Sequence, residues 1–305
     1  MPAPPLSLPH LAHDFPGLAG PLRGIERAAA SDAPALVLGE AGSGRSTLAR
    51  ALHAASPRAA GPLVQVDPGV VPAALFESEL FGYQAGAFTG ADHASEGRVA
   101  RAEGGTLVLD HVEELPLAAQ PKLLRLLAER RYAPLAGGET SADVRFVALG
   151  AEDLPQRVAR GAFRSDLFFR LEVLAFRLPP LRERRQDLPA LIAELLADLG
   201  ERFGRRRPEL APGAMAWMLE HPWPGNLRQL RNTLERALVL APEGPLDPAP
   251  PDLVLESRPR PLLEIEKEEI RRALAYTRGH QGRAAELLGI SRKALWEKRK
   301  RYGIP

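Results

Sequence analysis

The feature that most constrains this chain is a glycine-rich turn that comes directly after a short apolar run. The run ALVL at 35–38 leads into GEAGSGRST at 39–47, and helical spacing then continues to Ala54. A strand, a glycine-rich turn and a helix in this order point backbone N–H groups and the positive helix end at a phosphate chain. A turn without a ligand would explain the glycines but not this order, so we interpret the segment as a phosphate loop.

The loop predicts a bound nucleotide, ATP, together with Mg²⁺. Its letters fit the pattern G-x-x-x-x-G-[KR]-[ST], in which the Ser46 hydroxyl can reach the metal ion. Arg45 stands where the pattern calls for lysine, and a planar guanidinium is larger and differently shaped than an ammonium group. We expect binding to survive this change and hydrolysis to suffer from it. The expected nucleotide-binding residues of the loop are Gly39, Glu40, Gly42, Gly44, Arg45, Ser46 and Thr47.

Compact apolar runs alternate with helical patterns along the first part of the chain, which is typical of a parallel sheet flanked by helices. The runs lie at 35–39, 62–66, 105–110 and 144–150. Asp110 ends the third run, where a carboxylate would hold Mg²⁺ through water. An aspartate at a strand end can also cap a helix. The phosphate loop upstream favours the metal.

Changes in composition divide the chain into segments. Four prolines among the first fifteen residues predict that 1–16 is a tail without regular structure, and we expect the α/β core over 17–178. Because only some sixteen residues precede this core, we expect no receiver or ligand-sensing domain. Helical spacing predicts a small helical lid over 179–240, whose apolar face holds Leu188, Leu191, Ile192, Leu195, Leu196 and Leu199. A proline-rich linker is expected over 241–261 and a further helical domain over 262–305.

The last segment carries most of the positive charge. The formal net charge is +2, and 279–305 holds seven Lys or Arg against two Glu, which is +5 and leaves −3 for the rest. The segment predicts a helix at 283–288, a turn at 289–291 and a helix at 292–302, a helix-turn-helix for double-stranded DNA. A basic helical hairpin for protein contact is the alternative. The expected core is Ala284, Ala285, Leu288, Ile290 and Leu295, and the expected DNA-binding residues are Arg283, Ser291, Arg292, Lys293, Lys298, Arg299 and Arg301.

Composition also limits the setting in which the protein works. The chain has no cysteine, which excludes disulfides and thiolate metal sites. No stretch approaches the roughly 18 uninterrupted apolar residues of a membrane span, and the N-terminus does not have the pattern of a secretion signal. We therefore expect a cytoplasmic protein without membrane contact. Trp296 in the basic segment is expected to pack rather than to stack on bases.

The string ELFGYQAGAFTGAD at 79–92 carries a specific resemblance. The chain resembles the sigma-54-dependent transcription activators, which are AAA+ ATPases with a Fis-type helix-turn-helix. A glycine-flanked surface loop with one exposed Phe would explain the composition of this string, but not its position between the phosphate loop and Asp110. The resemblance implies contact with sigma-54 RNA polymerase through Gly86, Ala87, Phe88, Thr89, Gly90 and Ala91.

Further strings match the same family in order, including FRSDLFFRLEVLAFRLPPLRERRQDLPAL and HPWPGNLRQLRN. The resemblance implies that Arg164 and Arg170 are arginine fingers that reach a neighbouring subunit's nucleotide, and that Arg228 is the sensor arginine of the lid. It thus implies an oligomer, homomeric or heteromeric, from a dimer to a hexameric ring. The helix expected at 262–276 would help to pair two DNA-binding modules.

Four departures from the family pattern fall on its catalytic positions. Arg45 replaces the lysine, His111 replaces the glutamate that polarises water, Ala151 replaces the sensor asparagine, and Asp67 replaces the asparagine that restrains the glutamate. The catalytic set would then be Asp110, His111, Arg164 and Arg170. A histidine differs from a carboxylate in geometry and charge beside Mg²⁺. Glu113 and Glu114 are near enough to compensate, or they complement a helix dipole.

Three classes of function remain open on these grounds. The first is an ATP-binding, DNA-binding regulator of sigma-54 RNA polymerase, with hydrolysis that is weak or supplied by a partner subunit. The second is a DNA-binding regulator that has lost both ATPase activity and sigma-54 activation. The third, an unrelated P-loop enzyme such as a kinase, is disfavoured by the GAFTGA string at 86–91 and by the basic C-terminal segment.

Overall fold

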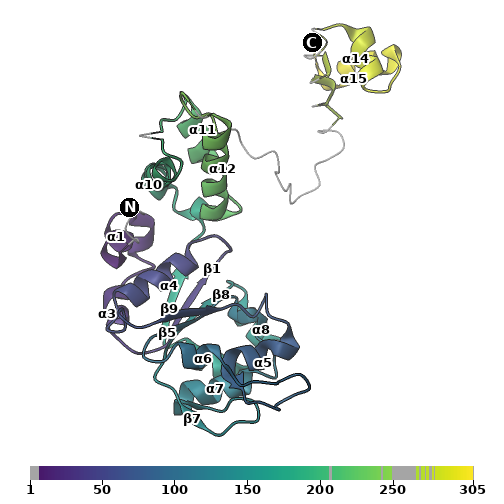
Figure 1. Cartoon of the computed structure of the whole chain (residues 1–305). Coiled ribbons are helices and arrows are strands. Elements are labelled where there is room, and N and C mark those ends of the chain that lie inside the picture. Colours follow the sequence, from purple (N-terminus) through teal and green to yellow (C-terminus); the bar gives the residue numbers. More distant parts are fainter. Residues whose placement is uncertain are drawn as a thin grey trace. The chain divides into compact units, whose positions relative to one another are not determined.

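The structure is a computed structural model that describes residues 7–205, 208–241, 243–248, 266–267, 269–271, 273–274, 277 and 279–304. The chain forms two compact units that divide at residue 250 (Figure 1). Most of the expected linker at 241–261 lies outside the described residues. Among the described helices, none is long and apolar enough to cross a membrane.

The first unit is built on a five-stranded parallel sheet (Figure 1). Its strands, in the spatial order β2-β5-β8-β1-β9, are β2 (Leu63–Val66), β5 (Thr106–Leu109), β8 (Arg145–Gly150), β1 (Ala35–Gly39) and β9 (Leu174–Leu178). Four of them confirm the predicted apolar runs, and so the α/β class. The fifth, β9, was not predicted, because its residues alternate between exposed and buried instead of forming one apolar run.

Two hydrophobic cores cover the two faces of this sheet. Alternate residues of β1 divide between them, since Ala35 and Val37 belong to one core and Leu36 and Leu38 to the other. The helices of the sheet region are α3 (Ile25–Ala29), α4 (Arg45–Ala54), α5 (Ala73–Phe81), α6 (Arg98–Arg101), α7 (Gln120–Glu129), α8 (Leu154–Ala159) and α9 (Ser165–Leu171). Two short antiparallel pairs, β3 (Gly82–Tyr83) with β4 (Ser95–Glu96) and β6 (Arg131–Tyr132) with β7 (Thr140–Ser141), lie outside the main sheet.

A helical lid follows β9 and shares the first core. It contains α10 (Leu188–Arg202), α11 (Ala214–Glu220) and α12 (Asn226–Leu240), preceded by the 3-10 turns η2 (Leu181–Glu183) and η3 (Arg185–Asp187). The predicted apolar face of α10 is confirmed, with five of its six residues buried and Leu195 partly buried. Trp223 is completely buried between α11 and α12, and its indole N–H donates to the Met218 carbonyl over 2.8 Å.

The expectation of an irregular N-terminal tail is wrong for the described part of it. Residues Leu8–His13 form α1, Ser7 caps this helix, and α2 (Pro16–Ala19) follows. Proline at the first turn of a helix is tolerated, because the N–H that it lacks has no intrahelical partner there. Leu8 and Phe15 are buried in the core that also contains the lid helices, and His10 contacts Glu194 of α10.

The second unit contains the predicted pair of C-terminal helices. They are α14 (Gln281–Leu287) and α15 (Arg292–Tyr302); the second confirms its predicted bounds and the first begins two residues early. All five predicted core residues pack in one cluster, together with Ile270, Ala273, Leu274, Tyr302 and Ile304. Of the helix expected at 262–276, residues 266–267, 269–271 and 273–274 are helical, and the other positions lie outside the described residues.

Candidate functional site

The phosphate loop joins β1 to α4 through two glycines in the left-handed region. Gly42 has φ +76° and Gly44 has φ +110°, conformations that cost an L side chain energy. A Cβ atom at Gly42 would also lie 2.5 Å from the Gly225 carbonyl oxygen of the lid. Gly44 caps α4, so the first N–H groups of this ten-residue helix face the turn. The loop therefore has the backbone of a phosphate-binding turn.

Arg45 is buried at the start of α4. Its side chain is 7% exposed, and its Nη1 has no hydrogen-bond partner among the described residues. A buried guanidinium without a partner is costly, and a phosphate oxygen would satisfy it. The residues present thus fit the polyphosphate of a nucleotide. Thr47 follows on the same helix, and its hydroxyl accepts a hydrogen bond from Arg50 over 3.4 Å.

The lid contacts the loop through Glu40. The Glu40 carboxylate accepts two hydrogen bonds from Arg182, of 2.6 and 2.9 Å, and one of 3.1 Å from the Asn226 amide. The Arg182 guanidinium lowers the pKa of Glu40 below its usual value of 4.5. Glu40 was expected among the nucleotide-binding residues, but the structure commits its carboxylate to the lid. We call Glu40, Arg182 and Asn226 the lid contact.

Two backbone features bring the lid close to the same loop. The Leu227 N–H donates to the Gly42 carbonyl over 3.0 Å. A Cβ atom at Gly42 would lie 3.1 Å from Cβ of Arg228. The predicted sensor residue Arg228 is therefore beside the phosphate loop.

A second arginine supports the loop from behind. Arg184 is 2% exposed, and its Nη2 donates to the Ser43 carbonyl over 2.7 Å. Asp187 is fully buried nearby, and its Oδ1 accepts from the Gly17 N–H. Burial lowers the pKa of Arg184, and the charge of Asp187 opposes this shift. The buried Arg184 guanidinium therefore holds the phosphate loop through the Ser43 carbonyl, almost without contact with solvent.

The carboxyl ends of β1, β2, β5 and β8 meet at one edge of the sheet, as parallel strands require. Asp110, at the end of β5, is 7% exposed. Its Oδ2 accepts from Gln65 over 2.8 Å and lies 3.5 Å from the Ser46 hydroxyl. The structure thus brings together the two residues that were expected to hold Mg²⁺.

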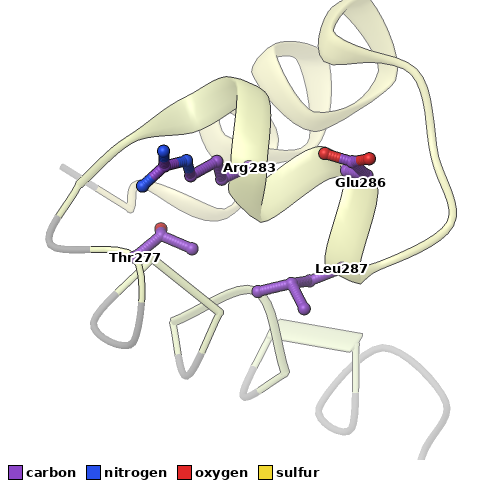
Figure 2. A pocket seen from close by; sticks show the side chains of 4 residues that line it. All are labelled: Thr277, Arg283, Glu286 and Leu287. Atoms are coloured by element: carbon purple, nitrogen blue, oxygen red, sulfur yellow. The ribbon is translucent and has the colours of Figure 1, made fainter.

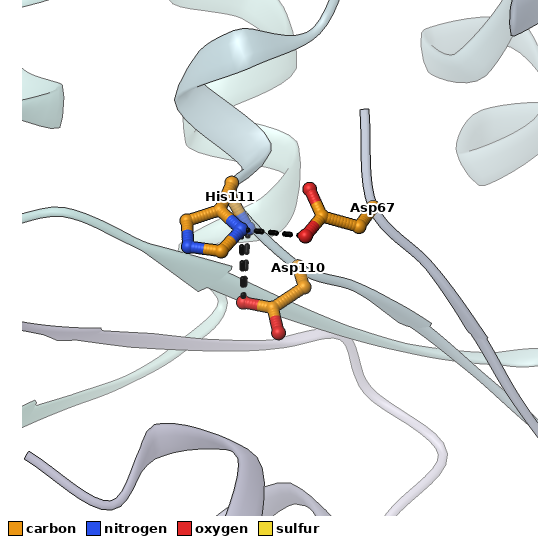
Figure 3. Close-up of side chains that lie close together, drawn as sticks. All are labelled: Asp67, Asp110 and His111. Carbon is orange, nitrogen blue, oxygen red and sulfur yellow. Dashed lines mark hydrogen bonds and ion pairs between the residues drawn. The ribbon is translucent and has the colours of Figure 1, made fainter. Parts of the chain in front are cut away.

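The other oxygen of Asp110 faces a histidine. His111 Nδ1 lies 2.9 Å from Asp67 Oδ2 and 3.8 Å from Asp110 Oδ1, and Figure 3 shows the two carboxylates converging on this one ring nitrogen. Asp67 Oδ1 accepts from the Gly69 N–H over 2.9 Å, which fixes its carboxylate. Asp67, directly after β2, and His111, two positions after β5, are therefore each other's partners.

Both nearby glutamates already have polar partners. Glu113 is 9% exposed, and its Oε2 accepts from the Ala151 N–H over 3.0 Å. Glu114 forms an ion pair with Arg157 over 3.2 Å. Ala151 itself ends β8 with a methyl group, which has no polar atom for a phosphate. The geometry therefore disfavours compensation by Glu113 or Glu114.

The predicted sigma-54 contact residues 86–91 form a tight loop between β3 and β4. Gly86 and Gly90 have positive φ, and the Gly86 N–H donates to the Ala91 carbonyl over 2.8 Å. Ala91 is buried, whereas Phe88 is 43% exposed and packs edge-on against Tyr83. The loop therefore presents the Phe88 ring at the surface, and the bond between Gly86 and the buried Ala91 closes the loop beneath it.

The two predicted arginine fingers lie on α9 and at its start. Arg164 is exposed and forms a two-bonded ion pair with Asp166, with distances of 2.7 and 3.0 Å. Arg170 is exposed and donates to the Leu127 carbonyl over 3.2 Å. Within the described residues, neither donates a hydrogen bond to the chain's own phosphate loop. Phe169 between them is 67% exposed.

The C-terminal helices separate the predicted DNA-binding residues into two groups. Arg283, Arg292, Lys293 and Arg301 are exposed, and Arg283 lines a pocket with Thr277, Glu286 and Leu287 (Figure 2). Ser291 caps α15 through its hydroxyl, which accepts from the Ala294 N–H. Lys298 instead forms an ion pair with Glu266, and Arg299 is partly buried. Trp296 does not pack in the core as expected, because it is 55% exposed and lies under Lys300.

Sequence reasoning missed the residues that hold the loop from the lid side. Arg182, Arg184 and Asn226 lie about 140 to 190 positions beyond it, and their chemistry depends on tertiary contacts. The only signal was the density of arginine in LPPLRERRQDLP, which does not distinguish a buried arginine from a surface one.

Comparison with known proteins gives three family matches in succession. The sigma-54 interaction domain matches residues 14–177, the AAA+ ATPase lid domain matches 182–258, and the Fis family of bacterial regulatory proteins matches 261–302. The three matches cover almost all of the chain after residue 13.

Full-length relatives agree with the domain matches. The transcriptional regulatory protein ZraR of Klebsiella oxytoca is 40% identical over 297 residues, which cover 93% of this chain and 67% of that protein. The alginate biosynthesis regulator AlgB of Pseudomonas aeruginosa is 41% identical, over 95% of this chain and 66% of its own length. The crystal structure of NtrX from Brucella abortus in complex with ATP has a TM-score of 0.71 at 33% identity, covering 95% of this chain and 68% of that one. The chain spans about two thirds of the length of these relatives.

Proposed function

We propose a function from one premise: the chain belongs to the family of sigma-54-dependent transcription regulators. It binds ATP with Mg²⁺ at the phosphate loop and double-stranded DNA through α15, in the cytoplasm. It contacts sigma-54 RNA polymerase through residues 86–91, and its own ATP hydrolysis is slow. Fast hydrolysis comes from a competent neighbouring subunit in an oligomer.

One observation supports slow hydrolysis: each described acidic side chain beside Asp110 already has a polar partner. Asp67 is bonded to His111, Glu113 to the Ala151 N–H, and Glu114 to Arg157. A general base must lie within hydrogen-bond reach of the water that it activates. Among the described residues, no carboxylate without a partner therefore lies beside Asp110 to activate a water, although the phosphate loop keeps its backbone conformation.

Nucleotide binding is supported by the cradle itself. Arg45 Nη1 lacks a partner, the N–H groups at the start of α4 face the turn, and Ser46 lies beside Asp110. Ser46 and Asp110 would hold Mg²⁺, which would neutralise charge on the phosphates. Arg228, which lies beside Gly42 on the lid, would add a further positive charge.

Oligomer formation would give Arg164 and Arg170 their role. Arg164 precedes α9 and Arg170 lies on it next to the exposed Phe169, and both are at the surface, where a second subunit can meet them. An arginine finger that is supplied in trans stabilises the transition state at the nucleotide of a neighbouring subunit. A slowly hydrolysing subunit would therefore still support a competent one.

The experiment that tests this proposal separates binding from turnover. We expect the purified full chain to bind ATP and to turn it over well below about 1 s⁻¹, the low end of ordinary enzymes. In a purified sigma-54 transcription assay it should activate poorly alone and better when mixed with a hydrolysing relative. Efficient activation by this chain alone with ATP would refute slow hydrolysis.

The same assay distinguishes the alternative, a DNA-binding regulator that has lost sigma-54 activation. Phe88→Ala removes the exposed ring of the loop and should abolish the stimulation seen in the mixture, without changing ATP binding. If the wild-type chain never stimulates in a mixture, the alternative is favoured. The exposed ring of Phe88 on its ordered loop supports the first function over this one.

DNA binding is tested by charge removal on α15. Lys293 is exposed at the start of this helix, and Lys293→Ala should weaken binding to all duplex sequences and lower the salt slope by about one. Lys122→Ala, which removes an ion-paired lysine of the first unit, is the matched control. Equal effects of both substitutions would contradict a DNA-reading role for α15.

A further inference from the structure

We infer that Asp67, Asp110 and His111 form a binding site for a divalent first-row transition-metal ion that needs no nucleotide. One imidazole nitrogen and two carboxylate oxygens, one from each residue, all lie within 4.8 Å of one another (Figure 3). The three residues lie at the ends of β2 and β5. We call them the strand-end triad. This inference does not depend on the proposed regulatory function.

The spacing of the ligand atoms suits one ion. Nδ1 of His111 lies 2.9 Å from Asp67 Oδ2 and 3.8 Å from Asp110 Oδ1. Metal bonds to nitrogen and carboxylate oxygen are about 2.0 to 2.2 Å long, so two ligands on neighbouring positions of one ion lie about 3 to 3.5 Å apart. Small rotations of the side chains are therefore enough to place an ion among all three atoms.

The surroundings already position two of the ligands. The Gly69 N–H fixes Asp67 through Oδ1, and the His111 N–H donates to Asp110 Oδ1 over 3.0 Å. Hydrogen bonds to ligating groups raise metal affinity by orienting them. The His111 side chain is 37% exposed, so an ion and its remaining water ligands can reach the triad from solvent.

The donor set selects the class of metal. Carboxylates alone suit Mg²⁺, Ca²⁺ and Mn²⁺, whereas an imidazole nitrogen favours the later ions from Fe²⁺ to Zn²⁺, with affinity rising as far as Cu²⁺ and lower again for Zn²⁺. Nδ1 must present its lone pair to the ion, so the ring that binds the ion is the neutral tautomer with its hydrogen on Nε2, which faces away from both carboxylates (Figure 3). The hydrogen bond between His111 and Asp67 is then replaced by coordination of both groups.

The triad uses a different side of Asp110 from the predicted Mg²⁺ position. Oδ2 of Asp110 faces Ser46 and Gln65, while Oδ1 faces His111. Binding at the triad therefore involves neither the phosphate loop nor ATP. It would place added positive charge beside the residue that the nucleotide's metal needs.

The test uses the tag-free full chain and Co²⁺ alone, without nucleotide. We expect one Co²⁺ per chain, seen by titration calorimetry and by the visible absorption of Co²⁺ bound to nitrogen and oxygen. Bound Co²⁺ should raise the melting temperature, since a ligand that binds only the folded chain stabilises it. A tenfold excess of Mg²⁺ should not displace it. A wild-type chain that binds Co²⁺ more weakly than about 1 mM would overturn the inference.

Variants locate the ion. His111→Gln and Asp67→Asn should each weaken Co²⁺ binding at least tenfold, the loss expected when a site loses a ligand. Asp67→Asn keeps the imidazole and the shape of the site, so it tests the triad even if His111→Gln fails to fold. Unchanged affinity in Asp67→Asn would overturn the inference.

His10→Gln is the matched control. His10 also lies between two carboxylates, but Asp14 contacts its Nδ1 and Glu194 its Nε2, so no single nitrogen converges with both. Its loss should leave Co²⁺ binding unchanged. If His10→Gln removed the binding and the triad variants did not, the ion would be assigned to His10 and the triad rejected.

Discussion

The two halves of the nucleotide site are built in different ways. The cradle, from Gly39 to Ser46, is formed by backbone conformation, a buried arginine and contacts from the lid. The opposite half, where β2, β5 and β8 end, would depend on individual side chains, among them Asp67, Asp110 and His111. Backbone N–H groups are present whatever side chain a position carries, whereas side-chain chemistry is lost when the residue changes. This difference would allow the slow hydrolysis that we propose to occur beside retained ATP binding.

The largest expected effect tests whether the cradle depends on the buried Arg184. Arg184→Met leaves Asp187 buried without its opposing charge, and we expect a loss of about 3 kcal/mol in the free energy of unfolding. ATP affinity should fall as well, because Arg184 holds the Ser43 carbonyl. Chemical denaturation and ATP titration measure the two effects.

A second variant separates lost charge from lost contact. Arg184→Met combined with Asp187→Asn removes the unpaired charge and keeps an oxygen for the Gly17 N–H. Stability should recover in part, while ATP affinity stays low. Full stability in Arg184→Met alone would show that the loop does not need its buried support.

The next prediction tries to repair the catalytic half. His111→Glu alone would place a second carboxylate beside Asp67, at the position where Nδ1 now lies 2.9 Å from Asp67 Oδ2. Like charges this close oppose each other. We therefore expect little gain from His111→Glu with Arg45→Lys, and a rise of about 30-fold in turnover, or 2 kcal/mol in the barrier, when Asp67→Asn is added.

Phosphate release from ATP under saturating nucleotide measures this repair. Arg45→Lys with Asp67→Asn, without the glutamate, is the control and should stay slow. If the triple variant Arg45→Lys, Asp67→Asn, His111→Glu hydrolysed ATP no faster than the wild-type chain, the cause of slow hydrolysis would lie at Ala151 or at the subunit interface.

Much of the fold was predictable from periodicity. Four strands coincide with the apolar runs of the sequence, α10 has a regular apolar face, and the core of the C-terminal helices has the expected residues. The edge strand β9 was missed because an exposed alternate face breaks the run. The helix α1 was missed because the prolines at 4, 5 and 9 disfavour a helix locally. The sequence does not show that Leu8 and Phe15 are buried in the core, and this packing stabilises the segment.

The site was predictable only where a local pattern encodes it. The loop, Asp110 and residues 86–91 are contiguous or follow a strand, so the sequence shows them. The bond between Asp67 and His111 joins residues 44 positions apart, and that between Glu40 and Arg182 joins residues 142 apart. Tertiary packing decides such pairs. It also places Lys298, which was expected to bind DNA because of its charge, in an ion pair with Glu266.

A smaller effect is expected from changing the cradle's backbone. Gly42→Ala adds a Cβ atom at φ +76°, 2.5 Å from the Gly225 carbonyl oxygen, so the loop or the lid must shift. We expect ATP affinity to fall about tenfold, or 1.4 kcal/mol. Gly138→Ala, where a Cβ atom meets nothing within 4 Å, is the control and should change nothing. Unchanged affinity in Gly42→Ala would mean that the cradle tolerates displacement.

The smallest effect concerns the lid contact, because its ion pair is partly exposed, with side-chain exposures of 41% for Arg182 and 30% for Glu40. Glu40→Gln should lower the free energy of unfolding by about 0.5 kcal/mol at pH 7. Since folding lowers the pKa of Glu40 from 4.5, the folded chain binds its proton less well, and the stabilisation is present above pH 4.5. It is lost as the pH falls through the lower folded pKa, so the difference between wild type and variant should shrink there. The double variant Glu40→Gln with Arg182→Gln should be little less stable to unfolding than either single variant. If the difference in unfolding free energy between wild type and Glu40→Gln stayed constant down to pH 3, the charge of Glu40 would not hold the lid.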